Sequence, residues 1–382
     1  MVKIKVAIDL LFLRPNKVGG TESYLRNLLK GFQTLDDKNN YYLFVSKNNC
    51  RQFEIDYKNF NVIKCSIDNS NRLKRLLYQN YRLPQKIKKV NPDIMFFPTY
   101  TRCLNKLNGI KVISNIHDLQ YKYYPEYFNI AKKIIFNIFY SVSIKKSDYL
   151  ITISDSVKDD INKFFGDKYK NKMKTIHNPI DFDKISKRNY TGSFKKIDVE
   201  KTKYILSVAS LLPHKNITTL IKAFNYYEKK NNSNFKLVLV GLKDKSTNKI
   251  TKLLSKFNLE NKVIIPGYVS NEVLASLYSN ALLFISPSKF EGFGMPPIEA
   301  MYNKIPVITT RCASLPEVTL EQAYYYDPPE DYEKLANKIN EVINNYPSDE
   351  KLNKIAGKAY KNYNLKKIAQ EYINFFEEVL NN

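Results

Sequence analysis

The sequence predicts an α/β protein of two doubly wound domains, and three observations carry this prediction. Short runs of apolar and β-branched residues alternate with longer amphipathic stretches along most of the 382 residues, which is typical of parallel sheets with helices on both faces. The apolar runs are nearly continuous, as they are in strands buried on both sides. The alternation pauses once, near the middle of the chain.

Five apolar runs in the first half are predicted to be β-strands. They are IKVAIDLL at 4–11, YYLFVS at 41–46, DIMFFPT at 93–99, KVISNIHD at 111–118 and DYLITIS at 148–154. The stretch TESYLRNLLKGF at 21–32 has the period of a helix, and Thr21 is a candidate N-cap. The first run is too short to span a bilayer, and no later segment reaches the ~20 apolar residues that a membrane helix needs, so we expect a cytoplasmic protein.

One polar segment separates the two halves. Residues 178–203 carry Pro179 and Gly192 and lack a sustained apolar period, which is typical of a linker. Helical patterns at 216–230, 271–280 and 365–380 follow, the last of them clearly amphipathic. The predicted strands of the second half are KYILSVAS at 203–210, FKLVLVG at 235–241, KVIIPGY at 262–268, LLFISPS at 282–288 and IPVITT at 305–310.

The composition restricts the class of protein. Hydrophobic residues make up 43% of the chain, enough to bury a substantial core. Four cysteines and three histidines show no metal-ligand spacing, so we expect reduced thiols, no metal and no cofactor. The net charge of +24 raises the question of nucleic acid, but no nucleic-acid-binding motif accompanies it, and we expect no such partner.

Two loops that follow predicted strands are suited to phosphate, and open α/β sheets bind ligands at this end of their strands. Gly19 and Gly20 precede the first helix, whose N-terminal amides attract anions; a tight turn with a cap explains them equally well. Ser210, His214 and Lys215 follow the first strand of the second half. Lys215 suits a phosphate, although a solvated lysine is the simpler explanation for this loop alone.

His117 lies at the end of a predicted strand, in the stretch NIHDLQYKYYPEYF. It could hydrogen-bond a ligand hydroxyl or shuttle a proton. It could equally be a buried histidine that donates to a backbone carbonyl.

The stretch KFEGFGMPPIEA at 289–300 places Glu291 and Glu299 around two glycines and two prolines. Glu291 lies in a strand-end loop, whereas Glu299 lies near the start of a helix that the prolines favour. The two could flank one bond as a glycosidase pair, could accept hydrogen bonds from hydroxyls at two places on an extended ligand, or could be a helix-terminal and a surface glutamate. The phosphate-suited loops favour a nucleotide sugar.

Taken together, these motifs resemble glycosyltransferase family 4, whose members are retaining enzymes of the GT-B fold. The most specific part is SPSKFEGFGMPPIEAMYNKIPVITTRCASLPEV at 286–318, which is similar to the family's E-x7-E signature and its flanks. Five shorter motifs follow the family's order along nearly the whole chain. They are GGTE at 19–22, HDL at 117–119, ITISDSVKDDI at 151–161, HNPID at 177–181 and LPHKN at 212–216.

The resemblance implies three parts of the chain. Residues 1–190 would form a Rossmann-like acceptor domain and 191–362 a Rossmann-like nucleotide-sugar domain, facing each other across a cleft. A helix at 363–382 would return to the first domain.

The resemblance also implies roles for individual residues. Glu299 would hold the ribose hydroxyls, Glu291 a hydroxyl of the transferred sugar, and Lys215 the leaving diphosphate. His117 would contact the sugar from the other domain, so the catalytic set is His117, Glu291 and Lys215. The other donor-binding residues would be Gly20, Ser210, His214, Gly267, Tyr268, Val269, Gly292, Phe293, Gly294 and Met295.

Two positions depart from the family pattern. Many members carry arginine where this chain has Ser210. The mannosyltransferase-like pattern G-T-L-x-P-R-K-N fits better, but its arginine is His214 here, so a titratable group replaces a permanent cation.

The resemblance implies a metal-independent, retaining hexosyltransferase, with GDP-mannose as the favoured donor. Its acceptor would be a glycan or a lipid-linked molecule in surface polysaccharide or glycoconjugate synthesis. UDP-hexoses, dTDP-rhamnose and a sugar-nucleotide-binding subunit without turnover stay open.

Basic residues concentrate in the first half of the chain. Residues 1–185 hold 33 Lys and Arg against 17 Asp and Glu, and the remainder holds 28 against 20. The segment 71–89 carries seven cations and no acid, and 131–146 repeats the pattern. One interpretation is core helices with their cations in water. The other is a peripheral anionic-membrane surface, with about 1 kcal/mol per cation, formed by Arg72, Lys74, Arg75 and Lys86.

Overall fold

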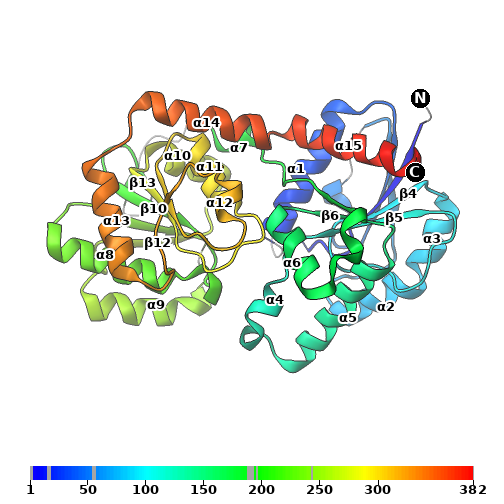
Figure 1. Ribbon diagram of the computed structural model, residues 1–382, viewed down its shortest axis with the longest axis horizontal. Helices are drawn as coiled ribbons and strands as arrows, with labels where there is room; N and C mark the ends of the chain where they lie inside the picture. Colours follow the sequence, from blue (N-terminus) through cyan, green and yellow to red (C-terminus); the bar gives the residue numbers. More distant parts are fainter. Residues whose placement is uncertain are drawn as a thin grey trace. The chain divides into compact units, whose positions relative to one another are not determined.

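The chain forms two compact α/β units in a computed structural model (Figure 1). The structure describes residues 3–14, 19–53, 57–186, 193–194, 197–241 and 244–381. Unit 1 comprises Met1–Pro179 and Leu365–Asn382, and unit 2 comprises Ile180–Asn364. The boundary expected at 190 lies outside the described residues, and the division falls earlier because Phe182 already packs its ring against Tyr302 of unit 2.

Unit 1 is built on a parallel sheet with the strand order β3-β2-β1-β4-β5-β6-β7. The parallel pairing agrees with strands that are buried along almost their whole length, such as β4. The strands are β1 (Lys5–Asp9), β2 (Asn40–Val45), β3 (Phe60–Lys64), β4 (Ile94–Phe97), β5 (Lys111–Ile116), β6 (Tyr149–Thr152) and β7 (Met173–Thr175).

The helices of unit 1 cover both faces of this sheet (Figure 1). They are α1 (Gly20–Leu35), α2 (Arg72–Tyr81), α3 (Leu83–Val90), α4 (Gln120–Tyr123), α5 (Ile130–Lys146), α6 (Asp155–Phe165) and α15 (Leu365–Asn381). Helix α1 begins at Gly20, with Gly19 as its N-cap and no side-chain cap hydrogen bond. The prediction that Thr21 caps this helix is therefore wrong, because Thr21 already lies in its first turn.

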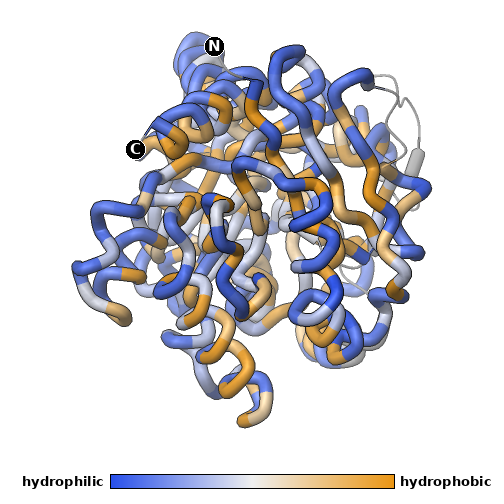
Figure 2. Tube along the Cα trace, turned by 90° about the vertical axis from the view of Figure 1, so that its right-hand side faces the viewer, coloured by the Kyte–Doolittle hydropathy of each residue, from blue (hydrophilic) through white to orange (hydrophobic). Residues whose placement is uncertain are grey.

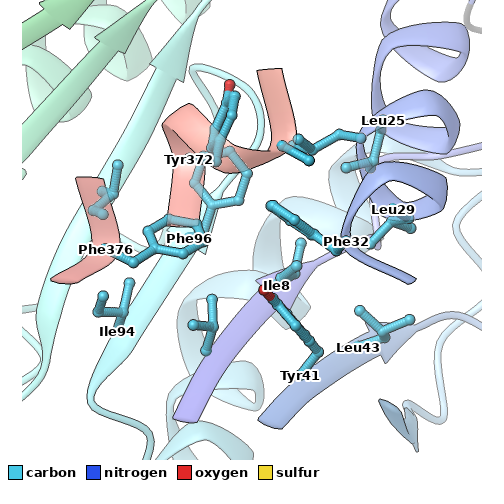
Figure 3. Packing of buried hydrophobic residues seen from close by; sticks show 14 of the residues in the cluster. Ile8, Leu25, Leu29, Phe32, Tyr41, Leu43, Ile94, Phe96, Tyr372 and Phe376 are labelled. Atoms are coloured by element: carbon cyan, nitrogen blue, oxygen red, sulfur yellow. The ribbon is translucent and has the colours of Figure 1, made fainter. Parts of the chain in front are cut away.

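The last helix, α15, completes the core of unit 1. Figure 3 shows Tyr372 and Phe376 of α15 packed with Phe96 of β4 and Phe32 of α1. The Tyr372 and Tyr24 hydroxyls share a buried hydrogen bond of 2.8 Å. A helix at the end of the chain thus packs on a helix that begins at residue 20.

Unit 2 is built on a second parallel sheet, with the strand order β12-β11-β10-β13-β14-β15. Its strands are β10 (Tyr204–Val208), β11 (Lys236–Val240), β12 (Val263–Gly267), β13 (Leu283–Ser286), β14 (Val307–Thr309) and β15 (Tyr324–Tyr325). A short antiparallel pair, β8 (Ser193–Phe194) and β9 (Ile197–Asp198), precedes this sheet in the chain.

Eight helices of the described chain belong to unit 2. They are α7 (Phe182–Ile185), α8 (Ile217–Asn231), α9 (Asp244–Phe257), α10 (Asn271–Asn280), α11 (Met295–Tyr302), α12 (Leu315–Val318), α13 (Tyr332–Asn344) and α14 (Asp349–Tyr363). Helices α8 and α13 share one apolar cluster with β10, β11 and β13.

No helix in the part of the chain that the structure describes is long and apolar enough to cross a membrane. Two helices of unit 1 nevertheless expose large apolar side chains. These are Leu73, Leu77 and Tyr81 on α2, and Ile130, Ile134 and Ile138 on α5, which are 48–74% exposed. In Figure 2, the segment that projects at the bottom of the view is coloured in part as hydrophobic and in part as hydrophilic.

Candidate functional site

In the sheet of unit 2, the order in which the chain adds its strands reverses between the neighbouring strands β10 and β13. The chain runs outward through β11 and β12 on one side and through β14 and β15 on the other, so the loops that follow β10 and β13 diverge. Open α/β sheets bind their ligands at such a switch point, outside the carboxyl ends of the strands. Lys215 follows β10 and Glu291 follows β13, so the topology brings both to this edge.

An ion pair joins these two loops. The Lys215 Nζ donates to both carboxylate oxygens of Glu291, at 2.6 and 2.7 Å, and the Ser288 hydroxyl donates to Oε1 at 2.7 Å. Burial by itself raises the pKa of Glu291, but the Lys215 charge and these hydrogen bonds outweigh it and hold the pKa below its ordinary value. Glu291 is therefore a carboxylate at neutral pH.

Asn216 fixes the Lys215 loop against its neighbours. It follows the short 3-10 helix Pro213–Lys215 and adopts the left-handed conformation, with φ of 55°, which asparagine tolerates. Its side-chain amide donates to the carbonyl of Pro287 at 3.1 Å and to that of Pro329 at 2.7 Å. The Asn216 side chain thus ties the loop that carries Lys215 to the backbone of the loop that carries Glu291.

His214 lies beside this pair with a buried ring. Burial, followed by the neighbouring Lys215 charge, lowers the pKa of His214 to about 4, although Glu291 opposes the shift. The ring is therefore neutral near pH 7. The titratable group that stands in place of the pattern's arginine therefore adds no positive charge near pH 7, because the loop buries the ring next to a lysine.

Gly294 shapes the turn between Glu291 and helix α11. It is the N-cap of α11 in the left-handed region, with φ of 90°, and a Cβ there would lie 3.2 Å from the Leu315 side chain. The helix begins at Met295, before the two prolines. Since Pro296 and Pro297 have no N–H, the first turn offers few amides to a ligand beyond those of the preceding loop, which includes Gly292.

Ser314 holds this loop in place from the start of α12. Its hydroxyl lies 2.8 Å from the carbonyl oxygen of Glu291 and 3.1 Å from that of Phe293. Both carbonyls accept hydrogen bonds within the protein, which leaves the Glu291 side chain aimed at Lys215.

Glu299 has a separate environment on α11. The Tyr278 hydroxyl donates to its Oε2 at 2.8 Å. Burial raises the pKa of Glu299, while the Tyr278 hydrogen bond and the Lys184 charge oppose the rise. The two glutamates of the motif therefore have different partners and opposite pKa shifts.

The remaining predicted residues of unit 2 also follow its strands. Ser210 is half-buried in the loop after β10. Gly267 ends β12 with φ of 78°, and its carbonyl accepts the Gly241 N–H at 2.9 Å. Tyr268 is exposed and Val269 is half-buried. All four lie at the carboxyl edge of the sheet, where Lys215 and Glu291 also lie.

His117 belongs to unit 1, where it follows β5. Its Nε2 lies 2.8 Å from the carbonyl oxygen of Pro98, so Nε2 carries the proton and donates, and Nδ1 is the nitrogen that can accept. The ring packs edge-on against Tyr24, with centroids 5.0 Å apart, and burial lowers the pKa of His117 to about 4. The hydrogen bond to a backbone carbonyl that one interpretation expects is present, while the contact of His117 with a sugar stays a prediction.

The four cations expected on one membrane-facing surface do not share a face. Arg75 is buried, and the Arg72 guanidinium lies over the ring of Phe136. Lys86 is half-buried, with its Nζ bonded to a backbone carbonyl at 3.2 Å, and only Lys74 is fully exposed. The surface placement of Arg75 is wrong, because α2 turns this side chain inward together with Leu76 and Gln79, whereas Arg72 is half-buried.

Two family models match this chain. The model for Glycosyltransferase Family 4 matches residues 18–184, and the model for Glycosyl transferases group 1 matches residues 191–362. The chain belongs to glycosyltransferase family 4.

Known proteins extend this result for the family 4 chain. The O-antigen chain mannosyltransferase RfbU of Salmonella typhimurium is 31% identical over 217 residues, which cover 56% of each chain. The match thus spans about half the length of the curated relatives.

Solved structures share the fold of this family 4 chain. A sucrose-phosphate synthase of Thermosynechococcus elongatus has a TM-score of 0.79 at 18% identity and covers 99% of each chain. The Anabaena protein HepE, solved in complex with UDP-glucose, has a TM-score of 0.75 at 17% identity and covers 98% of this chain and 100% of its own. These likenesses, with the two parallel sheets, show a GT-B fold.

Sequence reasoning missed several residues of the family 4 site. Ser288 and Tyr278 donate to the two motif glutamates, and Ser314 and Asn216 hold the loops. Ser288 stands three residues before Glu291 in the same strand-end loop, a spacing that could have suggested contact. Tyr278 and Ser314 come from other elements, and the sequence around them contains no motif that predicts their contact with the glutamate loop.

Proposed function

We propose that this family 4 glycosyltransferase is a retaining enzyme that moves a hexose from a nucleotide sugar to a glycan or lipid-linked acceptor in surface polysaccharide or glycoconjugate synthesis. The cluster of Lys215, Glu291 and Ser288 at the switch point of unit 2 carries the proposal. A cation and a hydrogen-bonding carboxylate, held rigidly at the usual ligand edge of an α/β sheet, suit a diphosphate joined to a sugar.

The residues divide the donor between them. Lys215 stabilises the charge that develops on the leaving diphosphate, an effect that is strongest in the transition state. Glu291 accepts a hydrogen bond from a sugar hydroxyl, and the Lys215 contact keeps it ionised. Glu299, which lies on helix α11 beyond the loop of Glu291, accepts hydrogen bonds from the ribose.

GDP-mannose is the favoured donor. The match to an O-antigen chain mannosyltransferase supports mannose, and the LPHKN motif resembles the mannosyltransferase-like pattern except for His214 in place of its arginine. UDP-hexoses and dTDP-rhamnose are the alternatives, and HepE with UDP-glucose illustrates the first of them on this fold. A nucleotide-sugar-binding subunit without turnover is the alternative outside catalysis.

A screen of nucleotide sugars tests the proposal. The melting temperature of the purified chain is measured with GDP-mannose, UDP-glucose, UDP-galactose, dTDP-rhamnose and the free nucleotides, without added metal. We expect the largest stabilisation from GDP-mannose, because a ligand that binds only the folded state raises stability. NMR of the sugar product then reports the anomeric configuration, and an inverted product would contradict the retaining assignment.

We also propose that unit 1 rests on an anionic membrane surface. Helices α2 and α5 expose the apolar stripes described above, and the contact between Arg72 and Phe136 places the two helices side by side at that point. Lys74, Lys132, Lys145 and Lys146 are exposed on the same helices. Apolar residues flanked by lysines are typical of helices that lie in the membrane interface.

A further inference from the structure

A cationic cavity lies at the carboxyl edge of the sheet in unit 1. Its volume is about 290 Å³, close to the lower end of the range for ligand pockets, about 300 Å³. It sits where the loops after the paired strands β1 and β4 diverge, at the switch point of this sheet. Its lining is Phe12, Arg14, Thr21, Asn69, Arg72, Arg75, Thr99, Tyr100 and Thr101.

Three arginines, Arg14, Arg72 and Arg75, line this cavity. Arg75 is only 9% exposed. Burial lowers the pKa of Arg75, the Asp9 charge opposes this shift, and the charges of Arg72 and Arg14 lower the pKa further. One NH1 of Arg75 donates to a backbone carbonyl at 3.3 Å. The Nε groups of Arg75 and Arg72 are both buried and, among the described residues, have no hydrogen-bond partner.

Such unpaired buried donors are unusual in a folded protein. Buried polar groups are nearly always hydrogen-bonded, and an unpaired one costs about 1–3 kcal/mol. Arg75 lies on α2 one turn after Arg72, so both are carried inward by the same helix face. The arrangement is explained if a ligand accepts from both guanidinium groups.

The charge around the cavity is strongly unbalanced. No residue of its lining is acidic. The nearby carboxyl of Asp9 is buried, which raises its pKa to about 6, although hydrogen bonds and the Arg75 charge oppose the rise. The three arginines therefore outnumber Asp9, the carboxylate whose charge acts on Arg75.

We infer that this cavity binds a phosphate group of the acceptor. A phosphate monoester or a diphosphate carries close to two negative charges and matches the planar, bidentate geometry of arginine, whereas a carboxylate carries one charge. Thr21, in the first turn of α1, adds the positive end of a helix of 16 residues. The hydroxyls of Thr99 and Thr101, hydrogen-bonded to each other at 2.9 Å, suit the atoms beside that phosphate.

The acceptor thereby gains a chemical class. It is a sugar phosphate or a lipid-linked phosphate rather than a neutral glycan, an assignment that rests on the proposed transferase function. Helix α2 could contact both the phosphate and the lipid of such a molecule. Arg72 and Arg75 line the cavity, and Leu73 and Leu77 are exposed on the outside of the helix.

Pyrophosphate binding tests the cavity directly. Because Lys215 in unit 2 also attracts phosphate, the reference protein is Lys215→Met, titrated with inorganic pyrophosphate by calorimetry at fixed ionic strength. We expect one site in this protein, weakened about ten- to a hundredfold by adding Arg72→Met, as the loss of charged hydrogen bonds implies. Adding Arg14→Met instead provides an independent variant, because Arg14 bonds only an exposed carbonyl in the described structure.

Lys74→Met is the matched control. It removes one positive charge from the same helix, but its side chain is exposed and does not line the cavity, so pyrophosphate affinity should stay within about twofold. Equal affinity in Lys215→Met and in both double variants would overturn the inference.

Two further measurements separate the sources of failure. If Arg72→Met weakens binding to phosphatidylglycerol vesicles as much as pyrophosphate binding, the phosphate belongs to a lipid headgroup and the acceptor assignment is overturned. Failure of the transferase proposal shows differently, as the absence of nucleotide-sugar binding by the unmodified protein, whatever happens at the arginines.

Discussion

Glu291 and Glu299 share one sequence motif but differ in their surroundings. Glu291 is tied to Lys215 and Ser288, whereas Glu299 accepts from Tyr278. We expect Glu299→Ala to weaken binding of the free nucleotide about ten- to a hundredfold. Glu291→Ala should leave free-nucleotide affinity nearly unchanged and reduce turnover, as calorimetry and steady-state kinetics will show. An equal loss of nucleotide affinity in both variants would remove the division of roles.

Asp9 gives a pH dependence at the residue scale. Its pKa rises from 3.8 to about 6 through burial, so the folded state holds this proton more tightly than the unfolded state. The contribution of Asp9 to the free energy of unfolding is fully present at low pH. It is lost as the pH rises from about 4 through 6, and the total loss is about 3 kcal/mol.

Asp9→Asn should remove that slope from the free energy of unfolding measured between pH 4 and pH 7. The substitution is tolerable because Gln79, which donates to Asp9, has an unpaired amide oxygen among the described residues and can turn its amide over. An unchanged slope in the variant would show that Asp9 does not titrate in this range.

The site residues show what sequence can and cannot predict. Lys215 and Glu291 both follow predicted strands, and ligand-binding residues gather at the carboxyl ends of strands, so the sequence alone predicts that the two lie at one edge of a sheet. The sequence could not show that they form an ion pair, or that His214 is neutral, because both depend on how two loops bury each other.

At the scale of the elements, Gly31 allows helix α1 to pack closely against helix α15. A Cβ on Gly31 of α1 would lie 2.7 Å from the Ala369 Cβ and 3.0 Å from the Leu365 carbonyl oxygen of α15. Gly31→Ala should therefore destabilise unit 1 by about 1–3 kcal/mol through overpacking, as measured by denaturant unfolding.

Gly357→Ala on α14 is the matched substitution. Nothing lies within 4 Å of a Cβ at that helical position, so alanine should stabilise the helix by about 0.5–1 kcal/mol. Gain of stability in both variants would contradict the close packing of α1 on α15.

Helix α2 shows why the elements are only partly predictable. Its sequence indicates a basic helix and, on one interpretation, predicts that the interleaved leucines lie inside with the cations in water. The structure agrees with this interpretation only in part, because Leu76 is buried and Lys74 exposed, whereas Arg75 is buried and Leu73 and Leu77 are exposed. The spacing of residues in the sequence shows which side chains share a face of the helix. Which face turns inward depends on the polar cavity beside the helix, which the sequence of α2 does not show.

At the scale of the whole molecule, the charge of +24 and the exposed apolar stripes predict membrane attachment. The chain should sediment with phosphatidylglycerol vesicles at low salt and be released at high salt. Leu73→Ser with Leu77→Ser and Ile134→Ser should weaken this binding, because each buried apolar side chain contributes roughly 1.5–3 kcal/mol. Full solubility beside anionic vesicles at low salt would refute the membrane surface and indicate a soluble acceptor.

The two-unit organisation follows from the alternation of strands and helices, which extends over nearly the whole chain. The exact division does not, because Ile180 and Phe182 belong to unit 2 through contacts with residues far along the chain. Such contacts leave no local pattern in the sequence.

The central claim is that unit 2 activates a nucleotide sugar through Lys215, and donor hydrolysis without an acceptor tests it most directly. Release of nucleoside diphosphate is measured with the donor that the screen selects, for the unmodified chain, Lys215→Met and Lys262→Met. Lys262 forms a similar ion pair, with Glu228, but precedes β12 at the opposite end of the strands. We predict slow release by the unmodified chain and by Lys262→Met, and a rate about a hundredfold lower in Lys215→Met. Equal rates in all three proteins, or no release from any nucleotide sugar, would contradict the account.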